Sequence, residues 1–193
     1  MEHTTSVKII GQDENTITLG GYGVVFGGRD LEGETFTKDT DFMLDLVPKK
    51  LVMYSHGLTE VKHSLGFVDN ATIKLQEAGM WIEAQLELSK KYVQEIKRLA
   101  EMGILGWSSG SVPHLTNVEK GIIKQWPIIE FSLTPTPAEP RTLGVEVLKE
   151  LVKLHPDLQA LMPEAPGNGA ADATAGGDDV SQQVLEALVR EKL

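Results

Sequence analysis

The sequence predicts a β-rich α+β domain in which an antiparallel sheet has one covered face. Three observations lead to this fold class. Short runs rich in β-branched and aromatic residues recur between residues 7 and 134, glycines and turn-forming residues separate these runs, and one amphipathic helical pattern interrupts them. At 193 residues the chain is long enough for one domain with a sizeable core but leaves little room for a second complete domain.

The strands predicted before this helix are short runs bounded by turn residues. The last run alternates the apolar residues Ile82, Ala84 and Leu86 with polar ones, which is typical of a strand with one buried and one exposed face. The stretch 27–33 breaks the pattern with glycines and other residues that favour turns. The predicted strands are residues 7–10, 16–19, 22–26, 51–56, 64–68, 72–75 and 80–88.

One helix is predicted from Ser89 onward, because apolar residues then recur every three to four positions and Gly103 is suited to follow its end. Two further strands, residues 104–112 and 122–133, come after it. The polar segment 116–121 between them is typical of a hairpin turn. The two strands are therefore expected to lie side by side.

Four parts are expected along the chain. Residues 1–140 form one domain, and a C-terminal helix lies within 141–162. The segment 163–179 is rich in Ala, Gly, Pro and Asp, cannot bury a core and reads as a flexible linker. Residues 180–193 are expected to form a short amphipathic helix, which is too short to be stable alone and needs a partner. From residue 163 on there are six acidic and two basic residues, so the tail is acidic.

Composition excludes several classes of function. A net charge of −10 without a cluster of Lys and Arg argues against binding nucleic acid through its phosphates. No apolar run approaches the ~20 residues of a membrane span, and the polar N-terminus has no secretory signal, so we expect a cytoplasmic site of synthesis. The absence of cysteine excludes disulfides and thiolate catalysis, and the five scattered histidines predict no metal site.

Three residues of the strand-rich part could form an acyl-transfer site: His56, Ser108 and Glu130. A serine hydroxyl is a poor nucleophile at neutral pH. It needs an imidazole within hydrogen-bonding reach to take its proton. That imidazole is best oriented by a third residue, which accepts a hydrogen bond from the other ring nitrogen. A regular hairpin centred on residues 119 and 120 would place Ser108 opposite Phe131, within one position of Glu130.

Each of these residues also has a purely structural explanation. A histidine at the end of an apolar run is commonly a hydrogen-bonded rim residue, and strand alternation could point Glu130 into solvent. Ser-Ser-Gly occurs in many turns and strand ends. Gly106-Trp-Ser-Ser-Gly110 also matches the Gly-x-Ser-x-Gly letters of an esterase nucleophile elbow, but the residues after it do not predict the required helix.

The flanking residues and their order resemble the prohead (capsid maturation) proteases of tailed bacteriophages. Five motifs between residues 20 and 140 carry this resemblance in unbroken order: a strand and turn at 21–34, an apolar strand ending in a histidine at 52–56, a Leu-Gly step at 64–67, a Ser-x-Gly strand at 107–110, and a Glu-x-Ser-Leu-x-x-x-Pro-Ala-x-Pro passage at 130–140. The resemblance implies a β-barrel flanked by helices, like that of the herpesvirus assembly proteases.

Carried over to this sequence, the resemblance implies that His56 is the general base, Ser108 the nucleophile and Glu130 the third member of a triad. Ser109 is a rival nucleophile, because the family often has an apolar residue there, although strand alternation points it to the opposite face. His114 is a rival for the third position, since the herpesvirus enzymes use a second histidine. We rank it below Glu130.

Two glycines near these residues are noted. Gly57 stands where the family often has Asp, which matters little if that Asp only shapes the turn. Gly110 could let substrate approach backbone N–H groups of an oxyanion hole, or it could mark a bulge in the strand.

We therefore expect a serine endopeptidase that needs no cofactor and cleaves scaffold and capsid segments inside the assembling prohead, in the host cytoplasm. Its expected partners are the major capsid protein, the scaffold protein and further copies of itself, and the linker 163–179 is an expected site of self-cleavage. The alternative is a protease-like domain with a scaffold-like tail that assists assembly without cutting.

Overall fold

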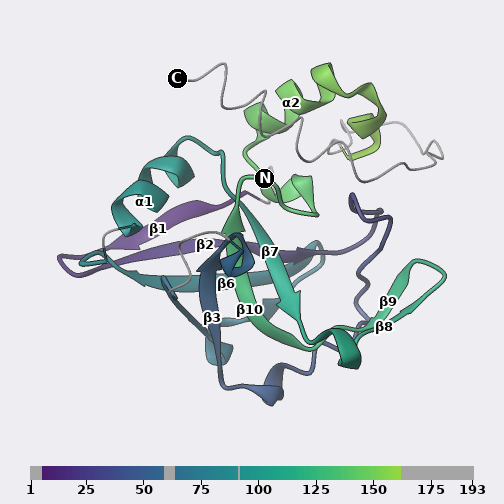
Figure 1. Ribbon diagram of the computed structural model, residues 1–193, viewed down its shortest axis with the longest axis horizontal. Coiled ribbons are helices and arrows are strands. Elements are labelled where there is room, and N and C mark those ends of the chain that lie inside the picture. The colour runs from purple at the N-terminus through teal and green to yellow at the C-terminus, as the bar shows by residue number, and fades with distance from the viewer. Residues whose placement is uncertain (1–5, 59–63, 91, 162–193) are drawn as a thin grey trace.

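The computed structural model describes residues 6–58, 64–90 and 92–161, and its main element is a curled eight-stranded sheet (Figure 1). Seven strands follow the order β1-β2-β6-β4-β3-β10-β7, β5 pairs with β6, and β8 and β9 form a separate ribbon. The strands are β1 Lys8–Gln12, β2 Thr16–Val25, β3 Lys49–Tyr54, β4 Gly66–Asp69, β5 Lys74–Leu75, β6 Gly79–Glu87, β7 Gly106–Ser111, β8 Asn117–Glu119, β9 Ile122–Gln125 and β10 Ile128–Thr134.

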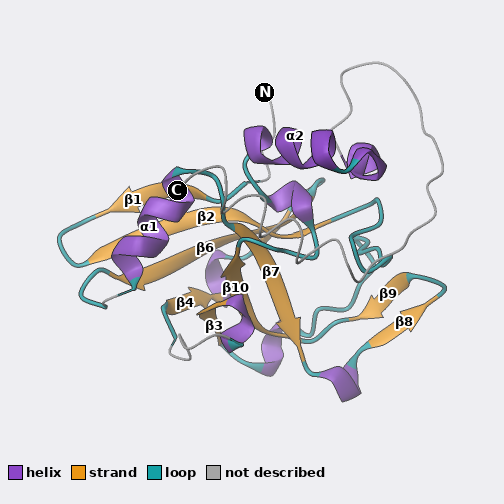
Figure 2. Ribbon diagram, turned by 45° about the horizontal axis from the view of Figure 1, so that its top comes forward, coloured by secondary structure: helices purple, strands orange, loops and turns teal. Residues whose placement is uncertain are grey.

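The fold is β-rich α+β, as predicted, but the sheet is neither fully antiparallel nor a closed barrel. β10 pairs with β3 in parallel, from Glu130 opposite Leu51 to Leu133 opposite Tyr54. A parallel pair requires a long crossover, and the chain between β3 and β10 supplies one because it passes through β4 to β9 and a helix. In the described part of the chain no pairing joins β1 to β7, so the sheet curls into half a barrel (Figure 2).

The runs 16–19 and 22–26, predicted as two strands, are one strand, β2. The glycines inside it make no turn. They leave space for aromatic rings that pack on the strand. A Cβ atom built on these glycines would come within 2.5–2.8 Å of a ring: Trp81 for Gly20, Trp107 for Gly21 and Phe131 for Gly23.

The single strand predicted over 122–133 is interrupted and forms β9 and β10. Pro127 lies at the interruption and has no N–H to donate to a ladder. β9 pairs with β8 around a turn at Lys120 and Gly121, which both have positive φ, and β10 then enters the main sheet. This break lets the chain use one short ribbon and one core strand in place of a long hairpin.

Two helices flank the sheet. α1, Val93–Glu101, starts at Val93 and not at Ser89. It lies beside β1 (Figure 1), and Gly103 follows its end with φ 70° as predicted. α2, Val145–Leu154, lies within the predicted segment 141–162. Val147 and Leu151 of α2 do not join the main core but form a second buried cluster with Leu143 and Leu158.

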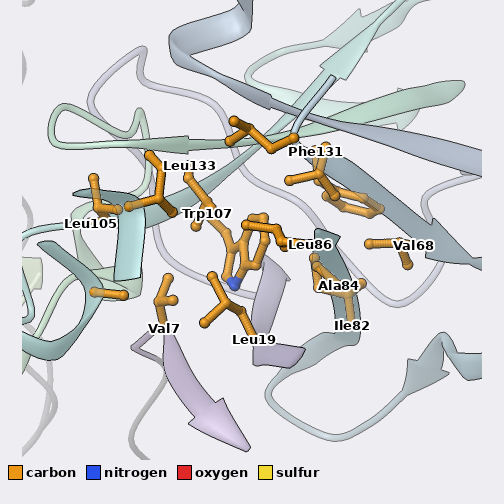
Figure 3. Packing of buried hydrophobic residues seen from close by; sticks show 14 of the residues in the cluster. Val7, Leu19, Val68, Ile82, Ala84, Leu86, Leu105, Trp107, Phe131 and Leu133 are labelled. Atoms are coloured by element: carbon orange, nitrogen blue, oxygen red, sulfur yellow. The ribbon is translucent and has the colours of Figure 1, made fainter. Parts of the chain in front are cut away.

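The core fills the inside of the curl. Trp107 of β7 and Phe131 of β10 are completely buried, and Figure 3 shows the Trp107 ring among Leu19, Leu86 and Leu133. Side chains alternate along a strand, so the residues next to Trp107 and Phe131 point to the other face of the sheet. That face carries the candidate site.

The linker predicted at 163–179 and the helix predicted at 180–193 lie outside the described residues. Among the residues that are described, no helix combines the length and the apolar character needed to cross a membrane.

Candidate active site

His56 lies just beyond β3, in a tight turn of residues Ser55–Gly57, and not at the end of a longer strand. All three residues of the turn have positive φ: 44° for Ser55, 54° for His56 and 68° for Gly57. This left-handed region is unfavourable for residues other than glycine and is often found at functional sites. The turn places the imidazole between two side chains of the neighbouring strands: its Nδ1 lies 2.6 Å from Glu130 Oε1, and its Nε2 lies 3.0 Å from Ser108 Oγ.

The register between β7 and β10 explains why Ser108 and Glu130 share a face. Ser108 lies opposite Ser132 and Gly110 opposite Glu130. The predicted register, with Ser108 opposite Phe131, is wrong by one residue and would have put Glu130 on the other face. A bulge between Ile128 and Glu130 causes the shift.

Gly110 provides the space for the Glu130 carboxylate. A Cβ atom on Gly110 would lie 1.8 Å from Glu130 Oε1, far inside any contact distance. The sequence offered an oxyanion hole or a bulge as explanations for this glycine, and the structure adds a third: Gly110 leaves room for the carboxylate that contacts His56.

The substitution Gly110→Ala is expected to push Glu130 away from His56. We expect a loss of stability of about 1–3 kcal/mol, typical of overpacking, and a fall in any hydrolytic activity on the order of 100-fold from misplacement of the imidazole. Urea denaturation and peptide hydrolysis would measure the two effects. Gly11→Ala is the matched control, because a Cβ there has no neighbour closer than 3.8 Å. Equal effects of the two substitutions would contradict this explanation.

Ser132 completes the arrangement, and sequence reasoning missed it. Its hydroxyl accepts a hydrogen bond from the His56 backbone N–H at 2.9 Å and donates one to Glu130 Oε2 at 2.7 Å. The available signal was its position two residues after Glu130 in a strand, which puts both side chains on one face.

The surroundings of His56 make its imidazole more basic than usual. The pKa of His56 is raised, mainly by its hydrogen bond to Glu130 and further by the negative charges of Glu130 and Glu32, while partial burial opposes the rise. The Glu130 side chain is largely buried and the His56 side chain is about one-third exposed. Substrate could therefore reach the imidazole, while the carboxylate is sheltered from water.

A cavity of about 230 Å³ opens beside His56 and Ser108. Part of its wall is apolar and aromatic, with Phe36 and Trp126 edge to face at 5.6 Å between ring centroids. The rest of its wall carries four carboxyl groups: Asp30, Glu32, Glu34 and Glu139.

In the described part of the chain, one ion pair involves these four carboxyl groups. Arg141 pairs with Glu139, its Nε 2.8 Å from Glu139 Oε1. Asp30, Glu32 and Glu34 form no ion pair with another described residue. Burial, assisted by the charges of Glu32 and Glu139, raises the pKa of Asp30 to about 6. A pKa of about 6 still leaves Asp30 mostly ionised at neutral pH, so the cavity wall is negative there.

Neither rival residue forms a hydrogen bond with His56 in the described part of the chain, although Ser109 also lines the cavity. Ser109 points to the other face of β7, where its Oγ accepts a hydrogen bond from Trp126 Nε1 at 3.1 Å. His114 is exposed in the turn Pro113–Leu115, and Glu130 occupies the position next to His56 Nδ1. Ser108 lies within a strand and not at a strand-to-helix elbow, so the esterase arrangement is absent here. Among the described residues, no group of His, Asp and Glu could hold a metal ion.

No protein-family model and no curated protein matches the chain. Among solved structures, the chain is similar to the KSHV protease in complex with a hexapeptide phosphonate inhibitor, with a TM-score of 0.40 and 17% sequence identity. The match covers 63% of this chain and 60% of that one, so this chain spans less than two thirds of the matched protein. The chemistry of the site therefore rests on its own geometry.

Proposed function

We propose that this protein is a serine endopeptidase. The observation that carries the proposal is the continuous line of contacts from Ser108 Oγ through both ring nitrogens of His56 to Glu130 Oε1, at 3.0 and 2.6 Å. This is the spacing and order that a nucleophile, a general base and an orienting carboxylate require.

In the proposed mechanism, Glu130 accepts a hydrogen bond from His56 Nδ1–H, and this tautomer leaves the Nε2 lone pair directed at the Ser108 hydroxyl. Ser108 Oγ attacks the peptide carbonyl while its proton passes to Nε2. The imidazolium that forms is stabilised by Glu130 and then protonates the leaving amine. Water repeats the sequence on the acyl-enzyme and releases the second product.

We further propose that its substrates are scaffold and capsid protein segments cut during prohead maturation in the host cytoplasm, with the enzyme present in several copies. The support is the ordered set of motifs between residues 20 and 140 that resembles the prohead proteases. The test is to incubate the purified protein with candidate capsid and scaffold proteins from the same source and to weigh the products by mass spectrometry. Cleavage would exclude the alternative, an assembly protein that does not cut. Intact partners after prolonged incubation would favour that alternative.

The negative wall of the cavity predicts a charge preference. At neutral pH we expect a peptide with Lys or Arg next to the scissile bond to be cleaved at least about tenfold faster than the same peptide with Glu there, because like charges in a partly desolvated site repel. A Gln peptide is the matched control and should fall between them. Added salt should reduce the ratio of the Lys-peptide rate to the Glu-peptide rate, because it screens the charges. Equal rates for the Lys and Glu peptides would contradict a role for the carboxylates.

Self-cleavage of the tail is a separate proposal. The segment 163–179 contains no Lys or Arg and three Asp and one Glu, so the charge preference makes it a poor substrate, whereas Arg190 and Lys192 near the end would be better ones. Intact masses of the active protein and a Ser108→Ala variant would show which cut, if any, depends on the serine.

A further inference from the structure

The turn that carries His56 needs an external support. Ser55 and His56 are not glycines, yet both adopt positive φ, a conformation that side chains with a Cβ rarely take without compensating contacts. A hydrogen bond from the His56 N–H to Ser132 Oγ, at 2.9 Å, ties this turn to β10. Besides the bond of the imidazole itself, one more side-chain hydrogen bond joins the turn to β10 in the described residues. It runs from Ser55 Oγ to Thr134 Oγ1 and is long, at 3.4 Å.

The same Ser132 hydroxyl also fixes Glu130. It donates to Oε2 at 2.7 Å, which leaves Oε1 facing His56 Nδ1 at 2.6 Å. Ser132 is completely buried, and its bond to Glu130 is buried as well. A hydroxyl suits this place because it accepts and donates at once.

We propose that Ser132 is a positioning residue that sets the backbone of the base and the orientation of the carboxylate with one hydroxyl, an inference that rests on the proposed function. Alanine at this position would leave the His56 N–H without its side-chain acceptor and free the carboxylate to rotate. Both changes would disturb the contact between His56 Nδ1 and Glu130 Oε1.

The test compares Ser132→Ala with Thr134→Val, which removes a hydroxyl from the same face of the same strand and the longer bond to the turn. The first readout is the downfield proton NMR signal of His56 Nδ1–H, identified by its absence in His56→Gln. The second is the rate at which a fluorophosphonate probe modifies Ser108. We expect Ser132→Ala to lose the signal and to slow the modification on the order of tenfold to a hundredfold, with Thr134→Val close to the parent protein.

A Ser132→Ala protein that keeps the signal and reacts within twofold of the parent would overturn the proposal. Should Ser132→Ala fail to fold, Ser132→Cys decides, because a thiol is similar in shape and a weak hydrogen-bonding group. Loss of the signal in folded Ser132→Cys supports the role, and its retention overturns it. The NMR readout needs no substrate. A parent protein that shows the signal but cuts no peptide would refute the proposed function and leave the positioning role standing.

Discussion

Replacing Ser108 with alanine is expected to abolish peptide cleavage while the protein keeps its fold. The serine side chain is only partly buried, and its recorded hydrogen bond is the one to His56 Nε2, so its loss removes the nucleophile and little packing. Removal of a triad serine typically lowers the rate by several orders of magnitude. The measurement is the single-turnover rate on the peptide that the parent protein cleaves fastest, with circular dichroism to verify the fold.

Ser109→Ala is the matched control, one residue away on the same strand. It removes the hydroxyl that Trp126 Nε1 contacts on the other face, so we expect most activity to remain and stability to fall slightly. If Ser109→Ala is the inactive variant and Ser108→Ala stays active, the assignment of the nucleophile is wrong.

Glu130→Gln is expected to give the second largest effect. The amide would hold the imidazole with the wrong hydrogen-bond polarity, so we expect a rate loss on the order of a thousandfold to ten-thousandfold. The neighbouring glutamate Glu32, which is not in contact with the imidazole nitrogens, provides the control: Glu32→Gln should retain most of the activity on an uncharged peptide.

The pH dependence of activity independently tests the pairing of His56 with Glu130. His56 must be neutral to accept the serine proton, and its pKa is raised, so activity should rise with pH through a value above the ordinary 6.5. In Glu130→Gln the hydrogen bond and charge that raise this pKa are gone and burial remains, so the rising limb should move to lower pH while the plateau falls. A flat parent profile between about pH 5 and 8 would contradict a histidine base. A fully active Glu130→Gln would remove that residue from the mechanism.

Local sequence patterns predicted most strands and both described helices, because alternation and helical spacing are local properties. What they could not predict depends on contacts between distant residues. The glycines of β2 look like turn residues until the rings of Trp81, Trp107 and Phe131 are placed on them. The bulge in β10 and the parallel pairing with β3 depend on the whole sheet.

The same distinction applies to the site. The chemistry of serine, histidine and glutamate, together with the family resemblance, was enough to select His56, Ser108 and Glu130, and the structure brings their side chains within hydrogen-bonding distance. Their catalytic roles remain predictions. Ser132 was missed although its spacing from Glu130 in a strand was an available signal, and the acidic cavity was not predicted because it depends on which carboxyl groups the fold brings together.

The parallel pairing of β3 with β10 has a consequence for when the protein can act. His56 and Glu130 are 74 residues apart, and they meet only after β10 has joined β3, a long-range contact whose closure entropy makes it slow to form. A partly synthesised or partly folded chain holds the serine and the histidine but lacks the assembled site. Any activity at this site would thus require the finished sheet.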